Sequence, residues 1–272
     1  MEFLDVLLGG NTARSASLAA MQPVVLLGRG HSGTRVLAWM CVHLGVKLGT
    51  SNPHIEGDPD DVTFTNKIKA LAAHNLDVNS PDQVRDSALR RFMAAVSAYY
   101  KGLGRPRGKW GWKFPETYLI APYVARTFPE AKYLHLVRDG RDVAFKSHLT
   151  DNPRHRVGRA VLGACNALGL PDHLRAAASW AYQVDRFDAF RAQLPAPHVM
   201  DIRFEDLCML PRQTAERLSA FLGVPMTDAC RAYADTGIDT LKIAQYRDQD
   251  PRLVDDVEQR IAATLRRYRY LP

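Results

Sequence analysis

One stretch near the start of the chain constrains the fold more than any other. Pro23 to Leu27 is a short apolar run between a proline and a glycine, which predicts a fully buried strand. A glycine-containing segment, Gly28 to Arg35, follows directly, and apolar residues then recur at helical spacing up to Leu44. The order of strand, glycine-rich loop and amphipathic helix is typical of an α/β fold in which the loop can hold an anion at a helix N-terminus.

The rest of the chain alternates in the same way. Strands are expected at 110–114, 133–137 and 198–203, a short one at 46–48, and helices at 62–102, 116–128, 174–193, 211–222 and 253–267. This alternation predicts a three-layer, P-loop-type α/β fold with a central parallel sheet flanked by helices. Residues 150–172 are expected to begin as an Arg-rich loop. The chain divides into a lead-in over 1–21 and one domain over 22–272.

Composition limits the class of protein. The 272 residues are 46% hydrophobic and 24% charged, which excludes a disordered or fibrous chain. Lys and Arg number 36 against 29 Asp and Glu, and the resulting net charge of +7 suits an anionic ligand. The four cysteines form no C-x-x-C pair, so no structural metal is expected. Because no run is long enough to span a membrane and no export signal is evident, the sequence predicts a cytoplasmic protein.

The loop from Gly28 to Arg35 is the first candidate site. Successive backbone N–H groups and the partial positive charge of the helix N-terminus are expected to converge there, an arrangement that binds phosphate or sulfate. An ordinary tight turn is the alternative. A nucleotide-kinase loop would continue from Gly33 with Lys and then Ser or Thr, whereas this chain has Thr34 and Arg35.

Further cations are expected at the same edge of the sheet. Arg138 follows a buried strand, at the end where ligands sit in open α/β sheets, and its guanidinium could hold a phosphate bidentately. Lys146 and Ser147 lie about two turns further along the next helix. Lys113 ends another strand, and it is expected to reach the same crevice because burying an unpaired ammonium costs energy. A surface Arg–Asp network and a snorkelling lysine are the alternatives.

These motifs, in this order, resemble the sulfotransferases that use 3′-phosphoadenosine 5′-phosphosulfate (PAPS). Gly30 to Arg35 is similar to the family's 5′-phosphosulfate loop, and Val137 to Val143 is similar to its 3′-phosphate motif. Trp112 to Pro115 is similar to its lysine-bearing strand end. Arg203 to Leu207 and Phe221 to Pro225 are similar to a common later block.

The resemblance implies a site that binds PAPS and releases adenosine 3′,5′-bisphosphate. It departs from the family's pattern at His31, where a lysine or arginine is usual, and at Lys146, which holds the place of the 3′-phosphate serine one residue before Ser147. The donor-binding residues expected from the resemblance are Arg29, Gly30, His31, Ser32, Gly33, Thr34, Arg35, Arg138, Lys146, Ser147 and Arg247.

The implied reaction transfers a sulfuryl group to a hydroxyl. It needs cations or N–H donors at the leaving oxygen and a base near the acceptor, and it requires no metal. His31, Arg35 and Lys113 would supply positive charge, provided that an adjacent sulfonate raises the pKa of His31. In the acidic loop after the first helix, Glu56 is the preferred base and His54 the next, although this loop could equally be a solvated turn.

The acceptor expected is a carbohydrate or glycoconjugate rather than a small phenol, although the fold alone does not choose. The ending Gly33-Thr34-Arg35 is similar to heparan-modifying members, and the basic segment 152–159 is consistent with an acidic glycan. One alternative is a P-loop kinase or other NTP-binding enzyme, with Asp139 as the Mg²⁺-binding acid. A nucleic-acid binder is not expected because Lys and Arg are dispersed along the chain.

Overall fold

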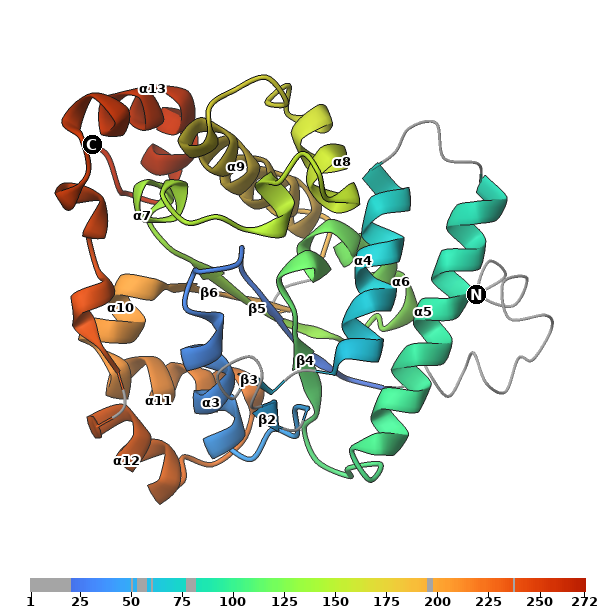
Figure 1. Ribbon diagram of the computed structural model, residues 1–272. Coiled ribbons are helices and arrows are strands. Elements are labelled where there is room, and N and C mark those ends of the chain that lie inside the picture. Colours follow the sequence, from blue (N-terminus) through green and yellow to red (C-terminus); the bar gives the residue numbers. More distant parts are fainter. Residues whose placement is uncertain are drawn as a thin grey trace.

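Four strands form the centre of the protein in the computed structural model, which describes residues 21–49, 51–52, 58–59, 61–76, 82–194, 198–236 and 238–272. They are β1 (Val24–Leu27), β4 (Gly111–Lys113), β5 (Lys132–Val137) and β6 (Val199–Arg203). The strand order is β4-β1-β5-β6, and every pairing is parallel (Figure 1). The expected parallel sheet is therefore confirmed.

The side chains of β1 show why helices cover both faces of this sheet. All four residues of the strand are buried. Val25 and Leu27 belong to the core on one face, whereas Val24 and Leu26 belong to the core on the other. An uninterrupted apolar run is what a central parallel strand with two covered faces requires.

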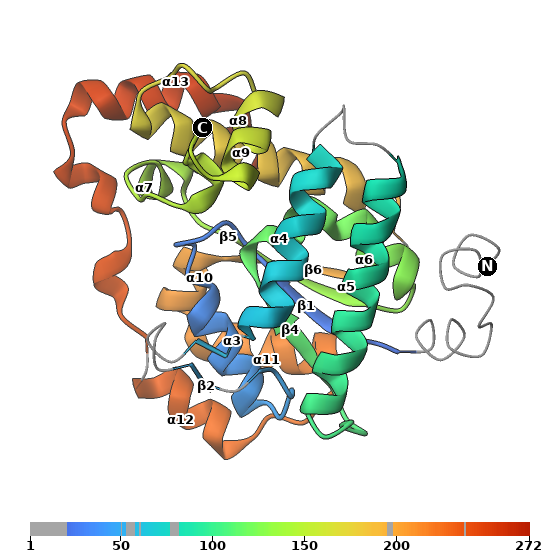
Figure 2. The same ribbon diagram turned by 45° about the vertical axis from the view of Figure 1, so that its right-hand side comes forward.

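Helices form the outer layers. One layer contains α3 (Thr34–His43), α10 (Phe204–Met209), α11 (Pro211–Leu222) and α12 (Asp228–Thr236). The other contains α4 (Val62–Leu76), α5 (Asp82–Gly102), α6 (Ala121–Thr127), α8 (Arg156–Ala164) and α9 (Asp172–Arg191). Figure 2 shows α4 and α5 side by side across the sheet from α3 and α11. The expected three-layer α/β architecture is confirmed.

Two more helices lie beyond the carboxyl ends of the strands. They are α7 (Gly140–Ala144) and α13 (Pro251–Arg267). Both pack against α9 through a separate apolar cluster that includes Val137, the last residue of β5 (Figure 1). This cluster fixes the start of α7, and therefore the residues between β5 and α7, against the end of the chain.

Several segments differ from the sequence expectations. The helical pattern over 62–102 is two helices, and residues 116–128 form η2 (Pro115–Ile120), a 3₁₀ helix, followed by α6. The Arg-rich segment contains the 3₁₀ helix η3 (Leu149–Asp151) and α8, whose buried Val157 and Val161 form an apolar stripe between exposed arginines. The helix α12 was not predicted.

Some expectations concern short segments or residues outside the described ranges. The strand expected at 46–48 is a single bridge between Lys47 and Trp110. Residues 1–20 of the expected lead-in lie outside the described residues. All four cysteines are free thiols. Among the described helices, none is long and apolar enough to cross a membrane.

Candidate active site

The candidate site lies where the carboxyl ends of neighbouring parallel strands meet. Lys113, the last residue of β4, pairs in register with Leu26 of β1, and β5 lies on the other side of β1. The loop after β1, Lys113 and Arg138 just after β5 are therefore brought to one edge of the sheet. Ligands bind at this edge in open α/β sheets.

The loop backbone adopts conformations that restrict its sequence. Gly33 has a φ of +88° and lies at the N-cap of α3, and His31 has a φ of +69°, which is unusual for a residue with a side chain. A Cβ atom at Gly30 would lie within 3.0 Å of the ring of His148, and one at Gly33 within 3.0 Å of the ring of Phe204. Glycine is needed at both positions because two aromatic rings pack against the loop.

The N-terminus of α3 presents donors to an anion. Among the described residues, the N–H groups of Gly33 and Thr34 have no main-chain acceptor, and a helix N-terminus carries partial positive charge. The buried hydroxyl of Ser32 has no hydrogen-bond partner in the described part of the chain either. These groups fit the 5′-phosphosulfate that the sequence resemblance implies.

Arg29 points into the protein. Its buried guanidinium donates to Asp151 Oδ2 at 2.9 Å, and it also donates to the carbonyls of Gly30 at 2.9 Å and Lys146 at 3.0 Å. Burial raises the pKa of Asp151, and the nearby Arg29 opposes that rise. A buried charge needs these partners within the protein. This geometry therefore does not fit the prediction that Arg29 contacts PAPS directly. Arg29 instead ties the loop to the segment 146–151.

His31 is a hydrogen-bond donor in the loop. Its Nε2–H donates to the carbonyl of Ser147 at 2.9 Å. Burial, followed by the charge of Arg29, lowers the pKa of His31 below the usual value. With these neighbours alone the imidazole is neutral at pH 7, and a positive charge on His31 still requires the adjacent sulfonate that the prediction invokes.

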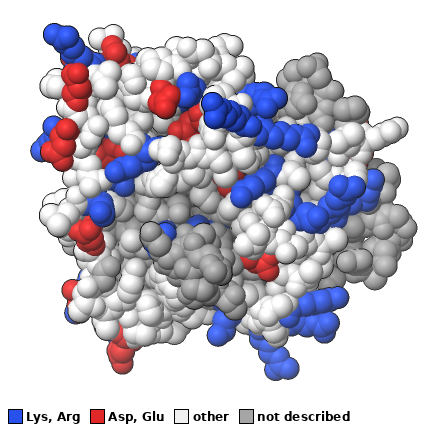
Figure 3. Space-filling model, in the orientation of Figure 1, with Lys and Arg blue, Asp and Glu red and all other residues white. Residues whose placement is uncertain are grey.

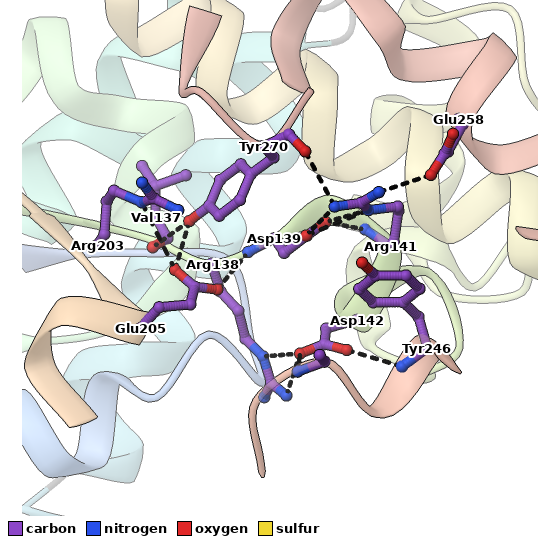
Figure 4. A network of polar contacts seen from close by, with 11 residues as sticks. Val137, Arg138, Asp139, Arg141, Asp142, Arg203, Glu205, Tyr246, Glu258 and Tyr270 are labelled. Atoms are coloured by element: carbon purple, nitrogen blue, oxygen red, sulfur yellow. Dashed lines mark hydrogen bonds and ion pairs between the residues drawn. The ribbon is translucent and has the colours of Figure 1, made fainter. Parts of the chain in front are cut away.

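Arg138 connects three parts of the site, and Figure 4 shows its contact with Asp142. It is 5% exposed, and its Nη2 and Nε donate to Asp142 Oδ2 at 2.9 and 3.3 Å. Its Nη1 donates to the carbonyl of His31 at 3.0 Å, and its Nη2 also donates to the carbonyl of Lys242. The guanidinium lies over the ring of Phe204, 4.6 Å from the ring centre. Arg138 therefore lies between the loop, α7 and a late segment of the chain.

The other residues predicted to bind PAPS differ in how exposed they are. Lys146 Nζ donates to Gln245 Oε1 at 3.0 Å, and Gln245 begins the 3₁₀ helix η5 (Gln245–Asp248). Ser147 is exposed and contacts His31 through its carbonyl. Arg247 is exposed on η5. The structure thus brings Lys146 next to the segment that carries Arg247.

Only some of the predicted catalytic residues lie in the described part of the chain. Lys113 is buried at the end of β4, and Arg35 is half-buried in the first turn of α3. Glu56 and His54, the predicted bases, lie outside the described residues. Their roles remain predictions from the sequence.

A cavity of about 1000 Å³ adjoins this edge of the sheet. It lies between the segment 144–154, the start of α9 and Gln249, and it reaches the loop at His148, whose ring packs against Gly30. Ten of the fifteen lining residues are polar: Lys146, Ser147, His148, Asp151, Asn152, Arg154, Asp172, His173, Arg175 and Gln249. Such a lining suits a ligand with many hydrogen-bonding groups.

Comparison with known families gives an independent result. A family model described as the sulfotransferase family matches residues 23–228, which is more than half of the chain. The chain belongs to the sulfotransferase family. The matched region contains the glycine-rich loop, Lys113, Arg138 and the cavity residues up to Ala176, so the resemblance drawn from the motifs is confirmed.

Individual sulfotransferases are distant in sequence. Protein-tyrosine sulfotransferase from Drosophila melanogaster is 23% identical over 172 residues, which cover 61% of this chain and 32% of the fly protein. Protein-tyrosine sulfotransferase 2 from Gallus gallus is 25% identical over 173 residues, covering 62% of this chain and 43% of the chicken protein. The chain therefore spans less than half the length of these curated relatives.

A solved structure shows the same fold. Sulfotransferase STF1 from Mycobacterium tuberculosis H37Rv is similar with a TM-score of 0.56 and 15% sequence identity, and the likeness covers 96% of this chain and 81% of that one. The sulfotransferase fold is thus shared although few residues are identical.

The candidate site also contains residues that the sequence analysis did not predict. His148 Nδ1 lies 2.9 Å from Thr150 Oγ1, and His148 Nε2 lies 3.5 Å from a carboxylate oxygen of the buried Glu116. Burial and then the charge of Arg29 lower the pKa of His148 well below its usual value. Glu116 directly follows the lysine-bearing motif in sequence, whereas no local pattern distinguishes His148 from other histidines.

The alternative functions find less support than sulfuryl transfer. The carboxylate of Asp139 caps α7 and accepts bonds from Arg141, at 2.7 Å from Nη2 and 3.0 Å from Nε, so it is engaged in a way that a Mg²⁺-binding acid of a kinase is not. On the face shown in Figure 3, Lys and Arg lie in separate groups with Asp and Glu among them. A nucleic-acid binder would present a continuous basic stripe.

Proposed function

We propose that this member of the sulfotransferase family transfers a sulfuryl group from PAPS to a hydroxyl of an acceptor. The observation that carries the proposal is the convergence of two anion-binding arrangements at one edge of the sheet. One is the N-terminus of α3 with the buried hydroxyl of Ser32, and the other is Arg138 with Lys146. A donor with a phosphosulfate at one end and a 3′-phosphate at the other matches such a pair of sites.

Each arrangement has a defined part in binding the donor. Residues 30–35 would hold the 5′-phosphosulfate through main-chain N–H groups. Arg138 would hold the 3′-phosphate, with Lys146, Ser147 and Arg247 as additional ligands. Arg29 keeps the loop against the segment 146–151 and so positions the N–H donors.

The chain's own groups would stabilise the charge that develops during transfer. The bound donor supplies the sulfuryl group and leaves as adenosine 3′,5′-bisphosphate after its bond from sulfur to the phosphate oxygen breaks. Lys113, Arg35 and the N–H groups at the start of α3 stabilise the negative charge on that oxygen. His31 contributes a hydrogen bond in the loop, and a charge on it requires the adjacent sulfonate.

The acceptor must lose a proton as its new bond to sulfur forms. We assign this proton transfer to Glu56, with His54 as the second candidate. Replacing Glu56 by Gln should lower turnover by about 100-fold to 10,000-fold because the base is lost, while the affinity for adenosine 3′,5′-bisphosphate stays the same. Steady-state turnover and bisphosphate titration measure the two effects. Asp58→Asn, a change in the same acidic loop, is the matched control, and normal turnover of the Gln variant would transfer the test to His54.

The lining of the cavity beside the loop informs the chemical class of the acceptor. Its polar lining supports a carbohydrate or glycoconjugate over a small phenol, because small-phenol sites are lined mainly by apolar side chains. Lys146 and the exposed Arg154 in this lining are compatible with an acidic glycan. A tyrosine within a protein is the second candidate, since two relatives carry the name protein-tyrosine sulfotransferase.

An acceptor screen with labelled PAPS tests the proposal. The panel contains an acidic oligosaccharide, a neutral oligosaccharide of the same length, a tyrosine-containing acidic peptide and a small phenol. We expect label on the oligosaccharides, with the acidic one preferred, whereas label on the peptide alone favours the second candidate. A thermal-shift comparison completes the test, and stabilisation by ATP–Mg²⁺ but not by adenosine 3′,5′-bisphosphate would refute the donor assignment.

A further inference from the structure

A late segment of the chain crosses over Arg138. We call residues 240–248 the strap; it contains the 3₁₀ helix η4 (Thr240–Lys242) and η5. Between the two, Ala244 has a φ of +58°, a left-handed conformation that a residue with a Cβ atom rarely adopts. Such a conformation persists only where surrounding contacts hold it.

Asp142 supplies those contacts. Its Oδ1 accepts a hydrogen bond from the N–H of Tyr246 at 2.9 Å, and its Oδ2 accepts one from the N–H of Ala244 at 3.0 Å (Figure 4). The same Oδ2 accepts the hydrogen bonds from Arg138. The side chain of Asp142 is 0% exposed, so one buried carboxylate joins the strap to the arginine.

Arg138 also binds the strap directly. Arg138 Nη2 donates to the carbonyl of Lys242, which lies in the strap before Ala244. Asp142 and Arg138 therefore bind the strap at three main-chain positions. Without the carboxylate, the guanidinium would keep its buried charge without a counter-charge, and two main-chain N–H groups would lose their acceptor.

A second anchor holds the following part of the chain without using Asp142. The guanidinium of Arg141 lies over the ring of Tyr246, 4.3 Å from its centre, and it pairs with Glu258 of α13 at 2.6 Å. It also donates to the carbonyl of Tyr270 at 3.1 Å. Loss of the Asp142 contacts should therefore loosen the strap locally while α13 stays in place.

We propose that Asp142 is a positioning residue that preassembles Arg138 and the strap as one unit for binding the 3′-phosphate of the donor. This inference rests on the proposed function, which makes the donor a 3′-phosphorylated nucleotide. The unit brings Arg138 and the strap residues Gln245 and Arg247 together before the ligand arrives, with Lys146 held to Gln245. Preassembly of this kind lowers the ordering cost of binding.

The test compares Asp142→Asn with Asp248→Asn, which removes the same charge from an exposed position on the strap. Calorimetric titration measures the affinities for adenosine 3′,5′-bisphosphate and for adenosine 5′-monophosphate, which lacks the 3′-phosphate. In Asp142→Asn we expect bisphosphate affinity to fall about 10-fold to 100-fold, as for the loss of a charged hydrogen bond. The affinity for the monophosphate should stay the same, and Asp248→Asn should match the wild type in both titrations.

Hydrogen exchange of strap peptides gives a readout that does not depend on activity. Exchange should be faster in Asp142→Asn than in the wild type, and unchanged in peptides from α13. Equal loss of affinity for both nucleotides, or unchanged strap exchange, would overturn the inference. If the wild type bound both nucleotides with equal affinity, the assignment of PAPS as the donor would be overturned. The claim that Arg138 and the strap bind a 3′-phosphate would then fail as well.

The wild-type protein provides a test that needs no variant and so does not depend on whether Asp142→Asn folds. A preassembled strap should be protected from exchange without ligand, and adenosine 3′,5′-bisphosphate should add little protection. A strap that becomes protected only when the bisphosphate is present closes on the ligand, and that result would overturn preassembly.

Discussion

The candidate site has two sides, one at the glycine-rich loop and one at the strap. Each side contains a buried arginine paired with a buried aspartate, but the two pairs join different elements. On the loop side, Arg29 and Asp151 meet at 2.9 Å, and the remaining bonds of Arg29 go to carbonyls of Gly30 and Lys146. On the strap side, Arg138 binds Asp142 and the carbonyls of segments that approach from two directions. The first pair joins the loop to the segment 146–151, whereas the second lies between the loop, α7 and the strap, where we propose the 3′-phosphate binds.

The difference follows from position in the sheet. Arg29 is followed at once by Gly30, and the segment 146–151 packs over it, so its guanidinium is enclosed. Arg138 leaves the end of β5 at the edge where the loop and the strap meet. Both arginines are buried, so the elements that each one joins distinguish them, and four predictions test this contrast.

Replacing Arg29 by Ala should have the largest effect. Asp151 would remain buried without its counter-charge, and the free energy of unfolding should fall by about 3 to 5 kcal/mol. Urea denaturation measures the loss, and Arg29→Met combined with Asp151→Asn should recover much of it because neither charge is then left alone. Wild-type stability together with lost bisphosphate binding would instead assign Arg29 to the donor.

Replacing Arg138 by Ala should weaken ligand binding and also lower stability, because the buried Asp142 would lose its counter-charge. Loss of a charged hydrogen bond to the 3′-phosphate should weaken adenosine 3′,5′-bisphosphate binding by about 10-fold to 100-fold in a calorimetric titration. Arg247→Ala is the comparison variant, and its effect should be smaller because Arg247 is exposed. Unchanged affinity in Arg138→Ala would remove this residue from the 3′-phosphate site.

Replacing Gly30 by Ala tests how tightly the segment 146–151 covers the loop. The new methyl group would lie within 3.0 Å of the His148 ring, and overpacking of this kind costs about 1 to 3 kcal/mol. His148→Ala in the same chain should restore part of the lost stability measured by urea denaturation. Gly108→Ala, which introduces a methyl group into open space, is the control. Equal stability of the Gly30 and Gly108 variants would contradict the close packing.

The smallest expected effect is a pH dependence of stability on the loop side. The pKa of His148 in the folded protein is well below its usual value of 6.5, so unfolding takes up a proton between these two values. The contribution of His148 is fully present above about pH 6.5 and is lost as the pH falls, by at most about 1.4 kcal/mol per pH unit. Unfolding free energies at pH 7.5 and 5.5 should therefore differ less in His148→Gln than in the wild type. An unchanged pH dependence of stability in His148→Gln would refute the assignment.

Local sequence patterns predicted the strand, loop and helix around the glycines because each depends on neighbouring residues. The apolar run of β1 and the helical spacing of α3 are such patterns, and Arg138 was placed correctly at a strand end for the same reason. The helix α8 was missed because its arginines obscure a buried stripe that forms only against η3 and α4. The apolar residues of α8 are buried only by tertiary contacts, and the local sequence does not reveal those contacts.

The candidate site likewise depends partly on local sequence patterns and partly on tertiary contacts. The sequence by itself determined the four strands, their parallel sheet and the helix after the loop, since hydrophobic periodicity is a local property. The tertiary structure decided which partner each buried cation meets. Arg29 meets Asp151 across 122 positions of sequence, and Asp142 reaches Tyr246 across 104. A buried charge is stabilised by whatever partner the fold brings to it, and no local pattern specifies that partner.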